Sequence, residues 1–146
     1  MVLWVETKEF EDVFEETVSL LTAVKGQVES NMNNKKIGDI SETSPEDIAA
    51  VNNDAINEMK ILSNLTVCLT SITSWLILNR AFNAGEVSLE YLIKEGKSLL
   101  DLISSQNYDK FFAKNFGNNL GNIIARSRHL FGSIKELTTI VENHKV

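Results

Sequence analysis

The chain has 146 residues, of which 43% are hydrophobic and 23% charged, with one proline and seven glycines. This length allows one domain with a substantial core, and the scarcity of turn-forming residues argues against an all-β sandwich. Because 20 acidic residues outnumber 14 basic ones, giving a net charge of −6, we expect no nucleic-acid partner.

The single cysteine and the first residues indicate the cellular compartment of the protein. Cys68 has no second cysteine to pair with inside the chain, which suits a reducing cytoplasm. The start of the chain reaches acidic Glu6 without the basic and apolar regions of a signal peptide. An uncharged segment between Lys60 and Arg80 is long enough to span a bilayer, but its many Ser, Thr and Asn residues favour a buried helix. We therefore expect a cytoplasmic protein with no membrane contact.

A first amphipathic helix is expected over residues 6–29. Its apolar residues recur at intervals of three and four, at Phe10, Phe14, Leu21, Val24 and Val28. The opposite face is acidic and includes Glu11 and Glu15. That face is either a solvated surface or a docking surface for a basic partner, and the sequence leaves both interpretations open.

The next segment, residues 30–44, mixes Asn, Gly and Ser without helical periodicity, which predicts a mobile connector. Ser44 and Pro45 then supply an N-cap and a first helical residue. A second helix is expected from this point to about residue 84, where Gly85 ends it.

The expected second helix carries two neighbouring rows of apolar residues along its length. Around Ile77, apolar residues surround the helix completely. Such a helix, about 60 Å long, is covered either by two neighbours in a bundle or by one neighbour and a second copy of the chain. We therefore expect a homodimer, or else a second helix that overhangs one end of the bundle. The residues predicted as core or dimer anchors are Ile61, Cys68, Trp75, Leu76, Ile77 and Phe82.

Two further helices are expected over residues 89–104 and 120–142, the first capped by Ser88 and weakened by Gly96. The aromatic-rich stretch between them is expected to be irregular or a short helix. No segment shows the alternation typical of a strand. The predicted fold class is all-α: an antiparallel bundle of three long helices plus a shorter connecting helix, forming one domain over residues 1–146 and assembling as a dimer.

The sequence shows no recognisable catalytic motif. His129 lacks the Glu three residues earlier that a di-iron bundle requires. All-helical nucleotide hydrolases hold magnesium with paired acids on two helices, whereas the second helix here offers only Asp54 and Glu58. We expect a non-enzymatic protein with no catalytic residue, cofactor or metal. A metal-dependent hydrolase-like domain and a purely structural helical module are the alternatives.

The end of the second helix carries a family resemblance. The motif comprises Glu58-Met59 and the run Ser74-Trp75-Leu76-Ile77-Leu78-Asn79-Arg80-Ala81-Phe82, followed by Gly85-Glu86. It resembles the RcdA family of alphaproteobacteria, the regulators of CtrA degradation. The resemblance implies a dimeric helical bundle that acts as an adaptor, helping the ClpXP protease to degrade cell-cycle regulators such as CtrA. The implied partners are the ClpXP protease complex, a response-regulator accessory factor and transcription-factor substrates.

Charged residues near the end of the second helix are candidates for partner contacts, because they can pair either with each other or with another protein. An internal salt bridge between Arg80 and Glu86 is the alternative. The full set of predicted partner contacts is Glu11, Glu15, Asn79, Arg80 and Glu86.

Overall fold

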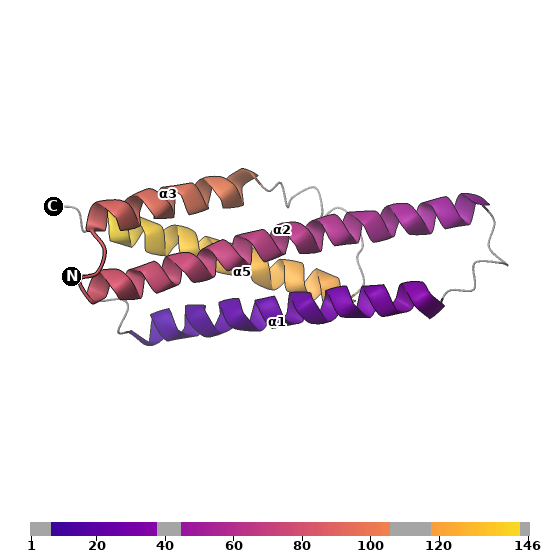
Figure 1. Cartoon of the computed structure of the whole chain (residues 1–146), viewed down its shortest axis with the longest axis horizontal. Coiled ribbons are helices and arrows are strands. Elements are labelled where there is room, and N and C mark those ends of the chain that lie inside the picture. The colour runs from indigo at the N-terminus through magenta and orange to yellow at the C-terminus, as the bar shows by residue number, and fades with distance from the viewer. Residues whose placement is uncertain (1–6, 38–44, 106–117, 144–146) are drawn as a thin grey trace.

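The structure, a computed structural model, describes residues 7–37, 45–105 and 118–143, and nearly all of these residues are helical (Figure 1). The helices are α1 (Lys8–Ile37), α2 (Pro45–Asn83), α3 (Leu89–Ser105) and α5 (Asn118–Asn143). No strand occurs in the described ranges. The predicted all-α class and helical bundle are confirmed.

The helices pack around the longest one. α1 lies beside α2 along most of its length, and α3 and α5 lie against one half of this pair (Figure 1). The beginning of α1 lies beside the end of α2, where Glu11 meets Arg80. The far part of α1 lies beside the earlier part of α2, where Asn31 meets Glu58.

Glycine ends α2 as the sequence predicts. Gly85 has a φ of +80°, a left-handed conformation that is open to glycine at little cost. The Glu86 N–H donates to the Ala81 carbonyl oxygen at 2.9 Å, and the Gly85 N–H donates to the Phe82 carbonyl oxygen at 3.0 Å. These two bonds satisfy carbonyl groups that the helix end would otherwise leave unpaired.

Hydroxyl side chains cap two helix beginnings. The Phe10 N–H donates to Thr7 Oγ1 at 3.3 Å, so Thr7 caps α1. The Tyr91 N–H donates to Ser88 Oγ at 3.2 Å, so Ser88 caps α3 as predicted.

The first helix is longer than the sequence predicts. α1 continues to Ile37, so the prediction of a connector over residues 30–44 is wrong for its first part. The rest of that connector and the aromatic-rich residues 106–117 lie outside the described residues. Asn31 explains part of the difference, because Gln27 donates to its side chain at 2.9 Å and it donates to Glu58 of α2 at 3.1 Å. Contact with α2 thus supports a stretch whose own helix propensity is weak.

A continuous hydrophobic core includes residues from each of the four described helices. Its largest side chain is Trp75, which is 2% exposed and whose Nε1–H donates to the Leu92 carbonyl oxygen at 3.3 Å. Gly96 of α3 is buried against this indole, and a Cβ at that position would lie 3.1 Å from Trp75 Nε1. Glycine at 96 therefore lets α3 approach α2 closely.

By length and composition alone, one helical stretch among the described residues could cross a membrane, residues 56–83 of α2. In its most apolar window 44% of the residues are buried inside the protein. The core helix of a soluble protein passes the same test.

Candidate protein-interaction surface

Most of the predicted anchors lie inside the bundle. Ile61, Cys68 and Leu76 are fully buried and Trp75 is nearly so, which makes them core residues of the single chain. Phe82 is half-buried and packs against the core. Ile77 differs from the rest, because 53% of it is exposed.

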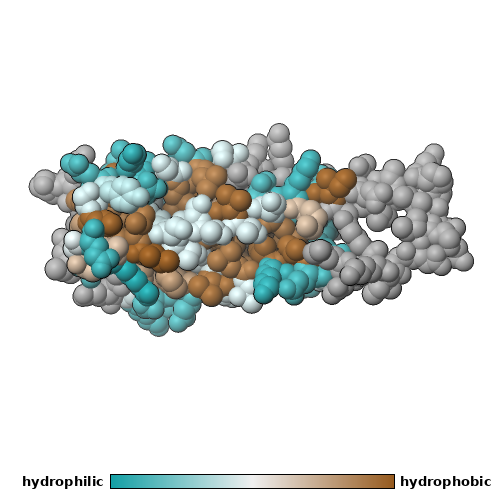
Figure 2. Space-filling model, in the orientation of Figure 1, coloured by the Kyte–Doolittle hydropathy of each residue, from teal (hydrophilic) through white to brown (hydrophobic). Residues whose placement is uncertain are grey.

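Ile77 belongs to an exposed row along the side of α2 that faces away from the core. We call this row the outer face of α2, and it consists of Ile56, Lys60, Ser63, Val67, Thr70, Ser74 and Ile77. Its three large apolar residues, Ile56, Val67 and Ile77, are each about half exposed. Lys60 is its one charge. Figure 2 shows the corresponding brown and pale surface across the middle of the molecule, with teal areas at its edges.

One hydroxyl group on this face and two beside it already form hydrogen bonds within α2. Ser74 Oγ donates to the Thr70 carbonyl oxygen at 3.1 Å, and Thr73 Oγ1 donates to the Leu69 carbonyl oxygen at 2.9 Å. Thr66 Oγ1 likewise donates to the Leu62 carbonyl oxygen at 2.8 Å. Because these donors bond within their own helix, the face is less polar than its composition suggests.

Arg80 joins the end of α2 to the beginning of α1. Its Nη2 lies 3.1 Å from Glu11 Oε1, and its guanidinium carbon lies 4.7 Å and 5.2 Å from the ring centroids of Phe14 and Phe10. The charge therefore stacks on two aromatic rings while pairing with a carboxylate. Arg80 pairs with Glu11 rather than with Glu86, so the alternative of an internal Arg80–Glu86 bridge is wrong.

Asn79 is fully buried, so the prediction that it contacts a partner is wrong. Its Nδ2 donates to the Trp75 carbonyl oxygen at 2.8 Å, while its Oδ1 has no hydrogen-bond partner among the described residues. Asn79 lies one turn after Leu76 in the same apolar row of α2. This spacing in the sequence indicates that Asn79 is buried.

The remaining acidic candidates are exposed. Glu15 and Glu86 lie on the surface, and neither forms an ion pair with a described residue. Glu86 lies beyond the end of α2, whereas Glu15 lies on the solvent side of α1.

Sequence reasoning missed the role of Arg126. Its Nε lies 2.9 Å from Glu16 Oε1, its Nη2 lies 3.1 Å from Glu16 Oε2, and the same Nη2 donates to Ser19 Oγ at 3.0 Å. The hydrogen bond with Glu16 raises the pKa of the Arg126 guanidinium, and burial opposes this with a smaller effect. This two-point contact fixes α5 to α1. No local sequence pattern in either helix predicts it.

The acids of α1 do not converge on a metal-binding arrangement within the described ranges. There, no group of three or more His, Cys, Asp or Glu side chains is placed so that it could hold a metal ion. Two of the α1 carboxylates, those of Glu11 and Glu16, instead pair with arginines.

These features define an all-α helical-bundle protein with an exposed, nearly uncharged face on its longest helix. The chain belongs to the family described as Protein of unknown function (DUF1465), which matches residues 4–146. No curated protein matches the chain, and no solved structure matches it.

Proposed function

We propose that this chain is a non-enzymatic adaptor, related to RcdA within its family, that assists regulated proteolysis of cell-cycle regulators such as CtrA by ClpXP in the cytoplasm. The observation that carries the proposal is the outer face of α2. A nearly uncharged exposed strip of this kind is typical of protein–protein contact. The motif that resembles the RcdA family includes Ser74 and Ile77 of this face.

The proposed assembly is an antiparallel bundle that pairs with a second copy through the outer face of α2. From Ile56 to Ile77 the strip is about 30 Å long and roughly 10 Å wide, or about 300 Å² in projection. A standard interface needs about 800 Å² from each partner. The dimer contact must therefore extend onto the neighbouring surface of α1, where Val18 is 45% exposed.

The dimer is tested by placing a charge on this face. Ile77→Asp should give a monomer in sedimentation at micromolar concentration, because an unpaired carboxylate in an apolar interface is strongly unfavourable. Ile140→Asp is the matched control, because Ile140 is an exposed isoleucine of α5, 42% accessible, and this variant should stay dimeric. A 16.3 kDa species for the unaltered chain, or equal behaviour of the two variants, would refute the dimer.

The adaptor role is tested by reconstitution. Purified ClpX, ClpP, the response-regulator accessory factor and a transcription-factor substrate are mixed with and without this chain, and the rate of substrate loss is measured. We expect a rate increase of at least about fivefold that saturates with the chain, as for a component that raises local concentration. Equal rates with and without the chain would contradict the proposal.

Magnesium titration by calorimetry addresses the hydrolase alternative. The adaptor proposal expects no stoichiometric binding. Binding that disappears in the double variant Glu11→Gln, Glu15→Gln would favour the hydrolase over the adaptor.

A further inference from the structure

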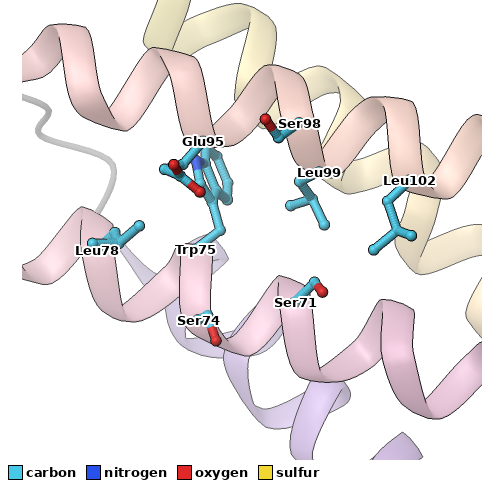
Figure 3. Close-up of a pocket in the computed structure, with 8 residues that line it drawn as sticks. All are labelled: Ser71, Ser74, Trp75, Leu78, Glu95, Ser98, Leu99 and Leu102. Atoms are coloured by element: carbon cyan, nitrogen blue, oxygen red, sulfur yellow. The ribbon is translucent and has the colours of Figure 1, made fainter.

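A groove separates the exposed sides of α2 and α3. It contains a pocket of about 220 Å³ with an apolar floor and a polar rim (Figure 3). The pocket is lined by Ser71, Ser74, Trp75 and Leu78 of α2 and by Glu95, Ser98, Leu99 and Leu102 of α3. Drug-sized ligands occupy cavities of roughly 300–1,000 Å³, whereas an apolar cavity of about 150 Å³ holds one benzene ring. This pocket therefore has the size for one bulky apolar side chain.

Among the described residues, Glu95 is the one charged residue on the pocket wall. Glu95 and Trp75 line the same pocket, and the Glu95 carboxylate forms no ion pair with a described residue (Figure 3). Two exposed lysines lie on α3, and neither pairs with Glu95: Lys97 pairs instead with Glu142 of α5 at 3.4 Å, and Lys94 forms no ion pair with a described residue. An occupant that covers Glu95 without supplying a cation would bury an unpaired carboxylate, which is costly. The groove thus selects for a positive charge.

The walls of the groove also limit the backbone conformation of an occupant. Both walls are helices, whose backbone groups bond internally, and Ser74 Oγ already donates to the Thr70 carbonyl oxygen. An extended peptide would find no ladder of donors and acceptors here, whereas a helical peptide satisfies its own backbone groups. From Glu95 to Leu102 the α3 wall is about 10 Å long, which is two helical turns.

We infer that the groove between α2 and α3 is a docking site for a short amphipathic helix of a partner protein. That helix places one leucine- or phenylalanine-sized side chain in the pocket over Trp75 and one Lys or Arg against Glu95. This inference rests on the proposed function, because it identifies the surface through which the adaptor holds a client or accessory protein. The occupant is a different protein from the second copy that covers the outer face of α2, and the two surfaces border each other at Ser74, which lies on that face and also lines the pocket.

A display library of helix-forming peptides of about 12 residues, selected on the immobilised full-length chain, tests the inference. Selected peptides should share a bulky apolar residue and, one turn away, a Lys or Arg. Binding of the best peptide, made synthetically, is then measured by calorimetry. It is also followed through Trp75 fluorescence in a Trp4→Phe background, because Trp75 lines the pocket.

Matched variants distinguish the contribution of the Glu95 charge to peptide binding from the contribution of the shape of the groove. Glu95→Lys should weaken binding at least about a hundredfold and Glu95→Gln about tenfold, since the first reverses the charge and the second only removes it. Asp101→Lys makes the same change in net charge on an exposed part of α3 that does not line the pocket, and it should bind like the unaltered chain. Ser98→Phe should block binding by filling the groove. Circular dichroism checks that each variant is folded.

Three outcomes would overturn the inference. Selected peptides could lack a basic residue, or could bind Glu95→Lys as well as the unaltered chain. Alternatively, Glu95→Lys could weaken self-association of the chain, which would mean that a second copy fills the groove. The adaptor proposal has its own test. If the chain speeds substrate degradation by ClpXP and Glu95→Lys speeds it equally, only the groove is refuted. If the unaltered chain does not speed degradation, the adaptor proposal is refuted.

Discussion

Replacing Gly96 by alanine tests whether the close approach of α3 to α2 depends on glycine. The added Cβ would lie 3.1 Å from Trp75 Nε1 and 3.5 Å from Thr138 Cγ2, so it meets neighbours on two other helices. The indole can move away only by lengthening its hydrogen bond to the Leu92 carbonyl oxygen, which is already 3.3 Å long. Two opposing effects therefore act at this one position.

The relative sizes of these two effects decide whether the variant is more or less stable. Alanine in the middle of a helix is more favourable than glycine by about 1 kcal/mol. Overpacking a well-filled core costs about 1–3 kcal/mol, and a weakened buried hydrogen bond adds up to about 1 kcal/mol. Gly96→Ala should therefore lower the free energy of unfolding by about 1 kcal/mol, although the substitution improves helix propensity.

Two other helical glycines provide the controls. A Cβ added at Gly26 or Gly132 would meet no atom within 4 Å, so their alanine variants should gain about 0.5–1 kcal/mol from propensity alone. All variants are compared by urea denaturation at one protein concentration, because dimer formation would make stability depend on concentration. A Gly96→Ala variant as stable as Gly132→Ala would refute the packing explanation.

Four smaller effects concern polar contacts, each measured by urea denaturation. Arg126→Lys should lower the free energy of unfolding by about 0.5–1 kcal/mol, because lysine cannot hold both oxygens of Glu16. Lys97→Met should change it by less than about 0.5 kcal/mol, because the ion pair of Lys97 is well exposed. Arg80→Lys keeps the charge but loses stacking on two phenylalanine rings, and it should cost about 0.5–1 kcal/mol. Asn79→Leu should raise stability by up to about 1 kcal/mol, because it removes a buried oxygen that has no hydrogen-bond partner among the described residues; a loss of stability would show that the amide is satisfied.

The helical fold could be predicted from local signals. Pro45 begins α2 and Gly85 ends it, and Ser88 caps α3, because each of these roles depends only on neighbouring residues. The extension of α1 could not be predicted in the same way. Asn31 is held by Glu58, 27 residues further along the chain, and a contact at that separation leaves no periodic trace in the sequence.

The interaction surface could be predicted only in part. Apolar residues surround α2 near Ile77, so periodicity alone could not show which row faces solvent. The structure resolves this, because Leu76 lies in the core while Ile77 is exposed. The groove beside Glu95 depends on the spacing between α2 and α3, which is set by the Trp75–Gly96 contact and is a property of the tertiary structure.

The unequal lengths of the helices have a consequence for how the protein opens. α1 and α2 extend together well past α3 and α5, so at that end each helix has only the other as a neighbour among the described helices (Figure 1). Stability within a domain follows local burial, and segments with few buried contacts open without global unfolding. Amide hydrogen exchange should therefore be graded along the single helix α2, slow around Trp75 and fast near Pro45. One continuous helix would then belong to two cooperative units, one that opens only with the whole bundle and one that opens by itself.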